Sequence, residues 1–165
     1  MKIDTNLWIG PVSKAWDSKY MKKHGITHVL CCAREFCDPP AYFNKAQDKT
    51  NWCYLPIEVD IADSKTKAHF LKGAAKLDKW LKAGKPVIVH SWGGISRSAA
   101  VVLTYYMVHK GLTYDDAFNK LKSRYPKLHP HPAYVKILKS ISSKTQTRKA
   151  TGKSRGIKRG TRKLQ

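Results

Sequence analysis

The sequence predicts a single α/β domain, with helices packed on the faces of a sheet. Short apolar runs rich in β-branched residues alternate along the chain with longer stretches in which apolar residues recur at helical spacing. A chain of 165 residues, 42% of them hydrophobic, can also bury one sizeable core. We therefore expect one domain over residues 1–141, followed over residues 142–165 by a basic tail whose low apolar content predicts disorder.

The expected strands are short and are bounded by turn residues. They comprise residues 6–10 (NLWIG), 26–32 (ITHVLCC), 52–57 (WCYLPI) and 87–90 (VIVH). Between the second and third strands, residues 33–51 predict a polar connection that contains prolines.

The expected helices follow apolar periodicity and end signals. They comprise residues 16–24, 67–81, 98–110, 114–124 and 134–140. The first is followed by Gly25, the usual place for a glycine at a helix C-terminus. Thr113 and Asp116, a hydroxyl and an acid three residues apart, predict the N-terminal cap of the fourth helix.

The net charge of +21 indicates anionic partners. Nine Lys or Arg and no acid lie between residues 144 and 165, while the rest of the chain carries 23 basic and 11 acidic groups, a net charge of +12. Phosphoproteins, nucleic acid and acidic membrane surfaces all fit such a field, as does a solvated basic surface. The charge therefore predicts a class of partner and no chemistry.

Cysteine usage and the N-terminal sequence predict an intracellular protein, cytoplasmic or nuclear. The start, MKIDTNLWIG, lacks the apolar stretch of a secretory signal, and no run of about 18 apolar residues predicts a membrane span. Four cysteines crowd the first third of the chain without a CxxC pair, which favours free thiols over a metal site.

Residues 86–102, PVIVHSWGGISRSAAVV, predict a phosphate cradle between a strand and a helix. Backbone N–H groups of such a loop and the positive end of the helix dipole bind an anion. Gly93 and Gly94 let the backbone approach the phosphate closely, and the planar fork of Arg97 can contact two phosphate oxygens at once. Ser98 at the helix start can bond back to Ser91, the first residue of the loop.

Ser91 occupies the position that faces phosphorus. The dipoles of the loop would turn a thiol there into a thiolate nucleophile, whereas a hydroxyl gains far less because its pKa starts much higher. No base beside Ser91 is evident in the motif. Serine at this position is therefore the feature that the function must explain.

The motif HSWGGISRSA resembles the signature loop of the cysteine-dependent protein tyrosine phosphatases, in their small dual-specificity branch, with Ser91 where the family has its nucleophilic cysteine. The resemblance runs from about residue 3 to residue 141 and includes NLWIGPVSKA, HGITHVL, LPIEVD and LTYDDAFNKLKSRYP in the family's order. It implies a mixed sheet of about five strands flanked by helices, and a reaction through a phosphocysteine that needs neither metal nor cofactor.

The resemblance also implies the roles of the site residues. Arg97 would bind phosphate and stabilise the transition state, and Ser98 would assist the leaving thiolate. Asp60, 31 residues before Ser91, would be the general acid and then the general base, with Asp63 as the reserve candidate. His90 would hydrogen-bond backbone and orient the loop. The phosphate-binding loop would comprise Ser91, Trp92, Gly93, Gly94, Ile95, Ser96 and Arg97.

Three explanations of the serine remain open. A deliberate replacement of cysteine would leave the cradle intact and trap substrate; a natural pseudophosphatase would bind phosphoproteins without hydrolysing them; a serine nucleophile would need a base. The retention of the glycines, Arg97, Ser98 and an acid favours deliberate replacement.

The resemblance implies that the substrates are phosphotyrosine, phosphoserine and phosphothreonine in proteins. The chain lacks room for the extra N-terminal segment that deepens the pocket in phosphotyrosine-only enzymes of the family, and a shallow pocket would admit all three. An RNA 5′-phosphatase of the same family is the alternative, since the basic tail could hold RNA or another polyanion, although it equally fits a nuclear signal. Trp92 and Ile95 could line the pocket or simply pack. His129 and His131 have metal-like spacing, but their prolines favour a rigid turn.

Overall fold

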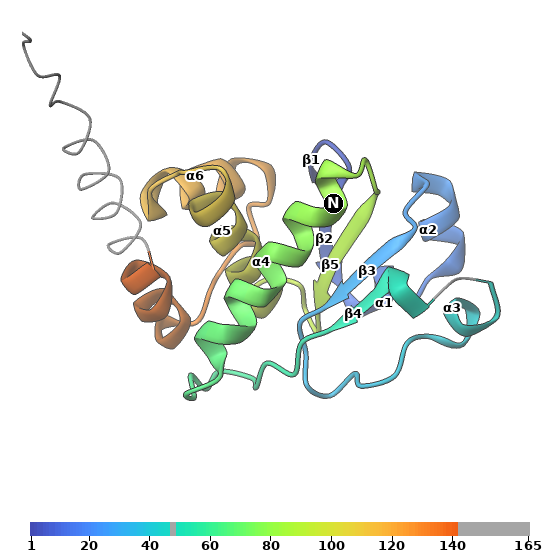
Figure 1. The fold of residues 1–165 in the computed structure, drawn as a ribbon, viewed down its shortest axis with the longest axis horizontal. Coiled ribbons are helices and arrows are strands. Elements are labelled where there is room, and N and C mark those ends of the chain that lie inside the picture. Colours follow the sequence, from blue (N-terminus) through green and yellow to red (C-terminus); the bar gives the residue numbers. More distant parts are fainter. Residues whose placement is uncertain (47–48, 142–165) are drawn as a thin grey trace, which may run out of the picture.

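A computed structural model describes residues 1–46 and 49–141 and contains one mixed sheet of five strands in the order β1-β2-β5-β3-β4 (Figure 1). The strands are β1 (Lys2–Asp4), β2 (Leu7–Pro11), β3 (His28–Cys31), β4 (Trp52–Tyr54) and β5 (Val87–Ser91). β1 is antiparallel to β2, and the pairs β2–β5, β5–β3 and β3–β4 are parallel. The predicted α/β class and mixed five-stranded sheet are confirmed.

Helices cover both faces of this sheet (Figure 1). The helices are α1 (Val12–Ala15), α2 (Ser18–His24), α3 (Ala41–Ala46), the short 3-10 helix η1 (Lys49–Asn51), α4 (Thr66–Lys82), α5 (Arg97–His109), α6 (Tyr114–Arg124) and a last helix over residues 132–141. One face packs against α4, α5, α6 and the last helix, and the opposite face packs against α1, α2 and α3.

The alternation of side chains along β5 explains the two layers. Val87 and Val89 are buried in the core beneath α4, α5 and α6, whereas Ile88 between them is buried against α1, α2 and α3. Successive side chains of a strand point to opposite faces, so a strand that is buried at every position, as β5 is, belongs at the centre of a sheet covered on both sides.

Most expected elements occur, with shifted ends. The connection expected over residues 33–51 joins β3 to β4, but it contains the helices α3 and η1, which were not anticipated, and α3 buries Phe43 against the sheet. The helix expected over residues 16–24 is α2 and begins only at Ser18, since the Asp17 carboxylate accepts hydrogen bonds from the backbone N–H groups of Lys19 and Tyr20. Strand β1 and helix α1 were not anticipated.

The expected tail over residues 142–165 lies outside the described residues. No helix in the described part of the chain is long and apolar enough to cross a membrane. The four cysteines are free thiols.

The parallel strands decide where a site can form. The carboxyl ends of β3, β4 and β5 meet at one edge of the sheet, so the segments that follow them lie together there. These segments are residues 32–36, residues 55–60 and residues 91–97. A crevice at this edge is the expected place for a ligand in an open α/β sheet.

Candidate phosphate-binding active site

Residues 91–97 form the predicted cradle between the end of β5 and the start of α5. Gly94 has a φ angle of +74°, and a Cβ there would lie 2.3 Å from the carbonyl carbon of Gly10. The loop therefore packs directly on the end of β2 and tolerates only glycine at this position. Among the described residues, none accepts a hydrogen bond from the backbone N–H groups of residues 93–97. These donors remain available for an anion at the N-terminus of the 13-residue helix α5.

Ser91 is buried at the base of the loop, and its Oγ lies 3.1 Å from Oγ of Ser98. Within residues 1–46 and 49–141, no histidine or carboxylate hydrogen-bonds to the Ser91 hydroxyl. The nearest candidate in sequence, His90, instead contacts the carbonyl oxygen of Ser91, with its Nδ1 3.4 Å away. The geometry therefore offers Ser91 a hydroxyl partner and no general base.

His90 is fully buried, and burial lowers its pKa to about 4. It is therefore neutral at pH 7 and places no positive charge beneath the loop. Its contact with the Ser91 carbonyl agrees with the expected role of orienting the backbone, which stays a proposal. Its Nε2 makes no hydrogen bond to any other described residue.

Arg97 is buried beneath the loop and held by Glu35. Both terminal nitrogens of the guanidinium donate to the Glu35 carboxylate at 2.6 Å, and Nη1 also donates to the Ile57 carbonyl at 3.3 Å. Burial alone would lower the pKa of Arg97, but the hydrogen bonds and charge of Glu35 raise it above its ordinary value. Because Glu35 occupies the outer edge of the fork, the edge formed by Nε and Nη2 is left for two phosphate oxygens.

Asp60 and Asp63, the two candidate acids, have different surroundings. Asp60 lines the pocket above the loop and is exposed, with a φ angle of +53°. The Asp63 carboxylate accepts hydrogen bonds from the backbone N–H groups of Lys65 and Thr66, both at 2.8 Å, at the start of α4. The Thr66 hydroxyl, which donates to the same carboxylate at 2.9 Å, and these backbone bonds lower the pKa of Asp63, so that Asp63 acts as a helix cap. Of these two acids, Asp60 is thus the one that lines the pocket.

The last helix fixes the segment that carries Asp60. The hydroxyl of the buried Tyr134 donates to the carbonyl of Glu58, and the Glu58 carboxylate pairs with Arg34. Two contacts from distant parts of the chain therefore hold the backbone just before the acid.

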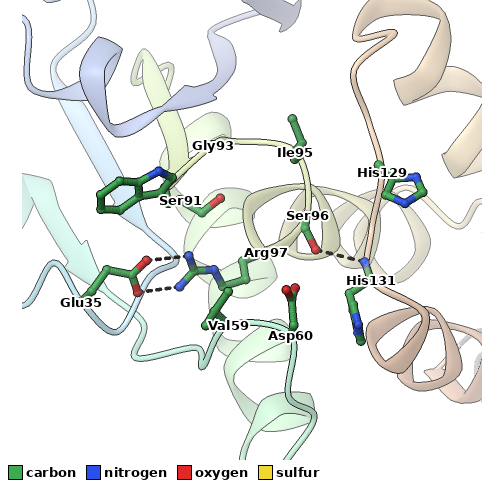
Figure 2. Close-up of a pocket in the computed structure, with 11 residues that line it drawn as sticks. Glu35, Val59, Asp60, Ser91, Gly93, Ile95, Ser96, Arg97, His129 and His131 are labelled. Atoms are coloured by element: carbon green, nitrogen blue, oxygen red, sulfur yellow. Dashed lines mark hydrogen bonds and ion pairs between the residues drawn. The ribbon is translucent and has the colours of Figure 1, made fainter.

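The pocket has a volume of about 470 Å³ and is open to solvent above Ser91 and Arg97 (Figure 2). Figure 2 shows Glu35 on one side of Arg97 and the pair His129 and His131 on the other. Its lining residues are Glu35, Val59, Asp60, Ser91, Trp92, Gly93, Ile95, Ser96, Arg97, His129 and His131.

The sequence did not point to Glu35, His129 or His131 as site residues. Glu35 follows β3, the neighbour of β5, so a known strand order would have placed it near Arg97, but one sequence does not supply that order. The turn predicted for HPHP was wrong, because residues 129–131 are irregular and residue 132 begins the last helix. The segment is instead held against the loop: the backbone N–H of His131 donates to Ser96 Oγ at 3.0 Å, and that of His129 donates to the Ile95 carbonyl. In the described residues, no cluster of three metal-ligating side chains includes either histidine.

The sequence model of the family described as dual specificity phosphatase, catalytic domain, matches residues 7–144. The chain belongs to the dual specificity phosphatase family. The resemblance stated from the motifs is confirmed, and the domain is of the protein phosphatase class of hydrolases.

Curated relatives of this dual specificity phosphatase domain carry two kinds of name. The human serine/threonine/tyrosine-interacting protein is 36% identical over 142 residues, which cover 83% of this chain and 61% of the relative. Dual specificity protein phosphatase 1B of Arabidopsis thaliana is 27% identical over 146 residues, which cover 88% of this chain and 83% of the relative. The chain thus spans about three-fifths of the length of the serine/threonine/tyrosine-interacting protein.

Solved structures share the fold. Human DUSP28 superposes with a TM-score of 0.75 and 26% identity, covering 88% of this chain and 93% of that one. The human tyrosine phosphatase-like serine/threonine/tyrosine-interacting protein superposes with a TM-score of 0.65 and 30% identity, covering 92% and 95%. Both superpositions extend over most of each chain.

Proposed function

We propose that this dual specificity phosphatase domain binds phosphorylated tyrosine, serine and threonine side chains of proteins on residues 91–97 without hydrolysing them at an appreciable rate. The absence of a base beside the Ser91 hydroxyl, whose hydrogen-bond partner in the described chain is Ser98, carries this proposal. A hydroxyl that keeps its proton is a poor nucleophile, whereas the N–H donors and Arg97 bind phosphate regardless of what stands at position 91.

The surrounding residues support a complete reaction once a thiol replaces the hydroxyl. The N-terminus of α5 would favour the thiolate, whose sulfur would form a bond to phosphorus as the ester oxygen leaves. Asp60 would donate its proton to that oxygen and then take a proton from the water that cleaves the sulfur–phosphorus bond. Arg97 would stabilise the charge of the phosphoryl oxygens in both steps, and the Ser98 hydroxyl would donate to the departing thiolate.

The serine has two explanations that share this chemistry. The intact set of Arg97, Ser98 and Asp60 favours deliberate replacement of a cysteine, which makes a form that traps substrate. Relatives named as serine/threonine/tyrosine-interacting proteins favour a natural pseudophosphatase that binds phosphoproteins. In both cases the chain as written binds a phosphomonoester and does not turn it over.

Calorimetric titration with one peptide, unphosphorylated or phosphorylated on tyrosine or threonine, tests the proposal. The phosphorylated forms should bind at least about tenfold more tightly, and Arg97→Lys should remove most of that difference because lysine lacks the fork. Equal affinity for phosphorylated and unphosphorylated peptide would contradict phosphate binding. Steady phosphate release by the chain as written would contradict the inert hydroxyl.

The RNA 5′-phosphatase alternative and the nuclear or cytoplasmic location stay predictions. RNA binding and a nuclear signal were predicted from the tail over residues 142–165, which lies outside the described residues. The intracellular location was predicted from the cysteines and the N-terminal sequence. No described residue of the pocket favours RNA over a phosphoprotein.

A further inference from the structure

A row of three aromatic side chains begins at the phosphate pocket and leads away from it. The indole of Trp92 stacks on the ring of Phe36 with centroids 5.6 Å apart and an interplanar angle of 21°. Phe36 in turn meets Trp16 edge-on, with centroids 5.5 Å apart. Trp92 lines the pocket, whereas Trp16 lies behind Phe36 and does not.

The row is fixed to the same backbone that builds the site. Phe36 directly follows Glu35, which holds Arg97, and the Trp92 carbonyl accepts a hydrogen bond from the Val12 backbone N–H at 3.1 Å. Trp92 is nevertheless 65% exposed, so its contact with Phe36 leaves a large part of the indole open. Val59 and Ile95 are also exposed and line the same pocket, so Trp92 belongs to an exposed apolar patch rather than being a single exposed side chain. Exposed apolar patches of this kind mark binding sites.

Val59 completes the arrangement, since it also lines the pocket and is 51% exposed. A phosphate on residues 91–97 would carry its ester group into the outer part of the pocket, whose lining includes Trp92. In phosphotyrosine that group is an aromatic ring, which can stack on the indole. In phosphoserine and phosphothreonine it is a short aliphatic carbon chain, which cannot stack.

We propose that the Trp92 side chain, which stacks on Phe36 and lines the same pocket as Val59, is a specificity residue that makes the site prefer aryl phosphates, and hence phosphotyrosine, to phosphoserine and phosphothreonine. This inference rests on the proposed function and sharpens it by ranking the substrates. Aromatic stacking of this kind changes affinity by roughly three- to tenfold.

The test is the ratio of dissociation constants for one peptide phosphorylated on threonine or on tyrosine at the same position, measured calorimetrically with the full chain. We expect tyrosine phosphate to bind about fivefold more tightly. Trp92→Ala should bring the ratio close to one, and Trp92→Phe should retain most of it. Trp16→Ala is the matched control, because it removes an exposed tryptophan from the same row without touching the pocket, and it should preserve the ratio.

The outcomes separate this inference from the proposed function. If phosphopeptides bind but the ratio is near one in the chain as written, or is unchanged by Trp92→Ala, the assignment of Trp92 is wrong while phosphate binding stands. An equal fall of the ratio in Trp16→Ala would also overturn it. If neither phosphopeptide binds more tightly than the unphosphorylated peptide, both proposals fail.

Discussion

His90 lies fully buried under the phosphate loop, and burial lowers its pKa to about 4. An unfolded histidine has a pKa near 6.5, so between pH 6.5 and 4 the unfolded chain binds a proton that the folded chain excludes. The stability that depends on neutral His90 is therefore complete above pH 6.5 and is lost as pH falls toward 4.

We predict that the free energy of unfolding in urea falls by about 3 kcal/mol more between pH 7 and pH 4 in the chain as written than in His90→Gln. Each protein is compared with itself at the two pH values, so a constant destabilisation by the glutamine cancels. Parallel pH profiles of the two proteins would show that His90 is not the group responsible.

Asp60 and Asp63 are three residues apart, yet the structure gives them separate surroundings. In the Ser91→Cys protein, Asp60→Asn should lower kcat for an alkyl phosphate by about 100-fold or more, because the leaving oxygen loses its proton donor. Asp63→Asn should lower stability by about 1 kcal/mol through the weakened cap of α4 and change kcat little. Steady-state kinetics beside urea unfolding checks both, and the reverse pattern would make Asp63 the acid.

The residues of the loop could be predicted from the sequence, because the motif is continuous and each of its residue types has a local reason. Glu35 could not, since its partner Arg97 is 62 residues away. The sequence also could not decide between Asp60 and Asp63 as the acid. Only the fold shows that Asp60 lines the pocket and that Asp63 caps a helix.

At the scale of elements, the connection from β5 to α5 depends on close contact with the end of β2. Gly94→Ala should destabilise the protein by about 2–4 kcal/mol, because its φ angle is +74° and its Cβ would meet backbone atoms of Gly10 and Pro11 at 2.3–2.7 Å. The neighbouring Gly93→Ala is the matched control, since its Cβ would meet only Ile95, at 3.9 Å. Thermal unfolding of both variants that shows equal losses would contradict this account of the loop.

Helices α6 and α3 show what local sequence signals can and cannot predict. The Thr113 hydroxyl caps α6 as expected, with the backbone N–H of Asp116 donating to it at 3.1 Å. Helix α3 escaped prediction because its segment begins after two prolines and is short, and its buried Phe43 finds its partners only in the folded sheet. Local sequence signals therefore predict helix caps well, but they predict poorly the short helices that form through packing.

At the scale of the whole molecule, the strand order β1-β2-β5-β3-β4 brings three loops to one edge. Periodicity predicted that strands and helices alternate, but the sheet's five strands and mixed direction came from the family resemblance. No local pattern specifies which strands are neighbours, because pairing is decided by packing across the entire chain.

The charge of the molecule divides into two parts that can be tested separately. Deleting residues 142–165 removes nine of the 32 basic residues and none of the described pocket. If the tail binds polyanions, its loss should lower affinity for single-stranded RNA at low salt by about tenfold or more and flatten the salt dependence. Binding titrations at several salt concentrations check this. Unchanged RNA affinity after the deletion would show that the tail does not bind nucleic acid.

The measurement that tests the central claim most directly is phosphate release from an aryl phosphate by the chain as written and by Ser91→Cys. Our account predicts no measurable turnover as written and robust turnover, inhibited by vanadate, in the thiol variant, because every other group of the reaction surrounds position 91. A folded Ser91→Cys protein that still binds phosphopeptides but releases no phosphate would contradict it. The site would then be a binding site alone, and the role proposed for Asp60 would lose its basis.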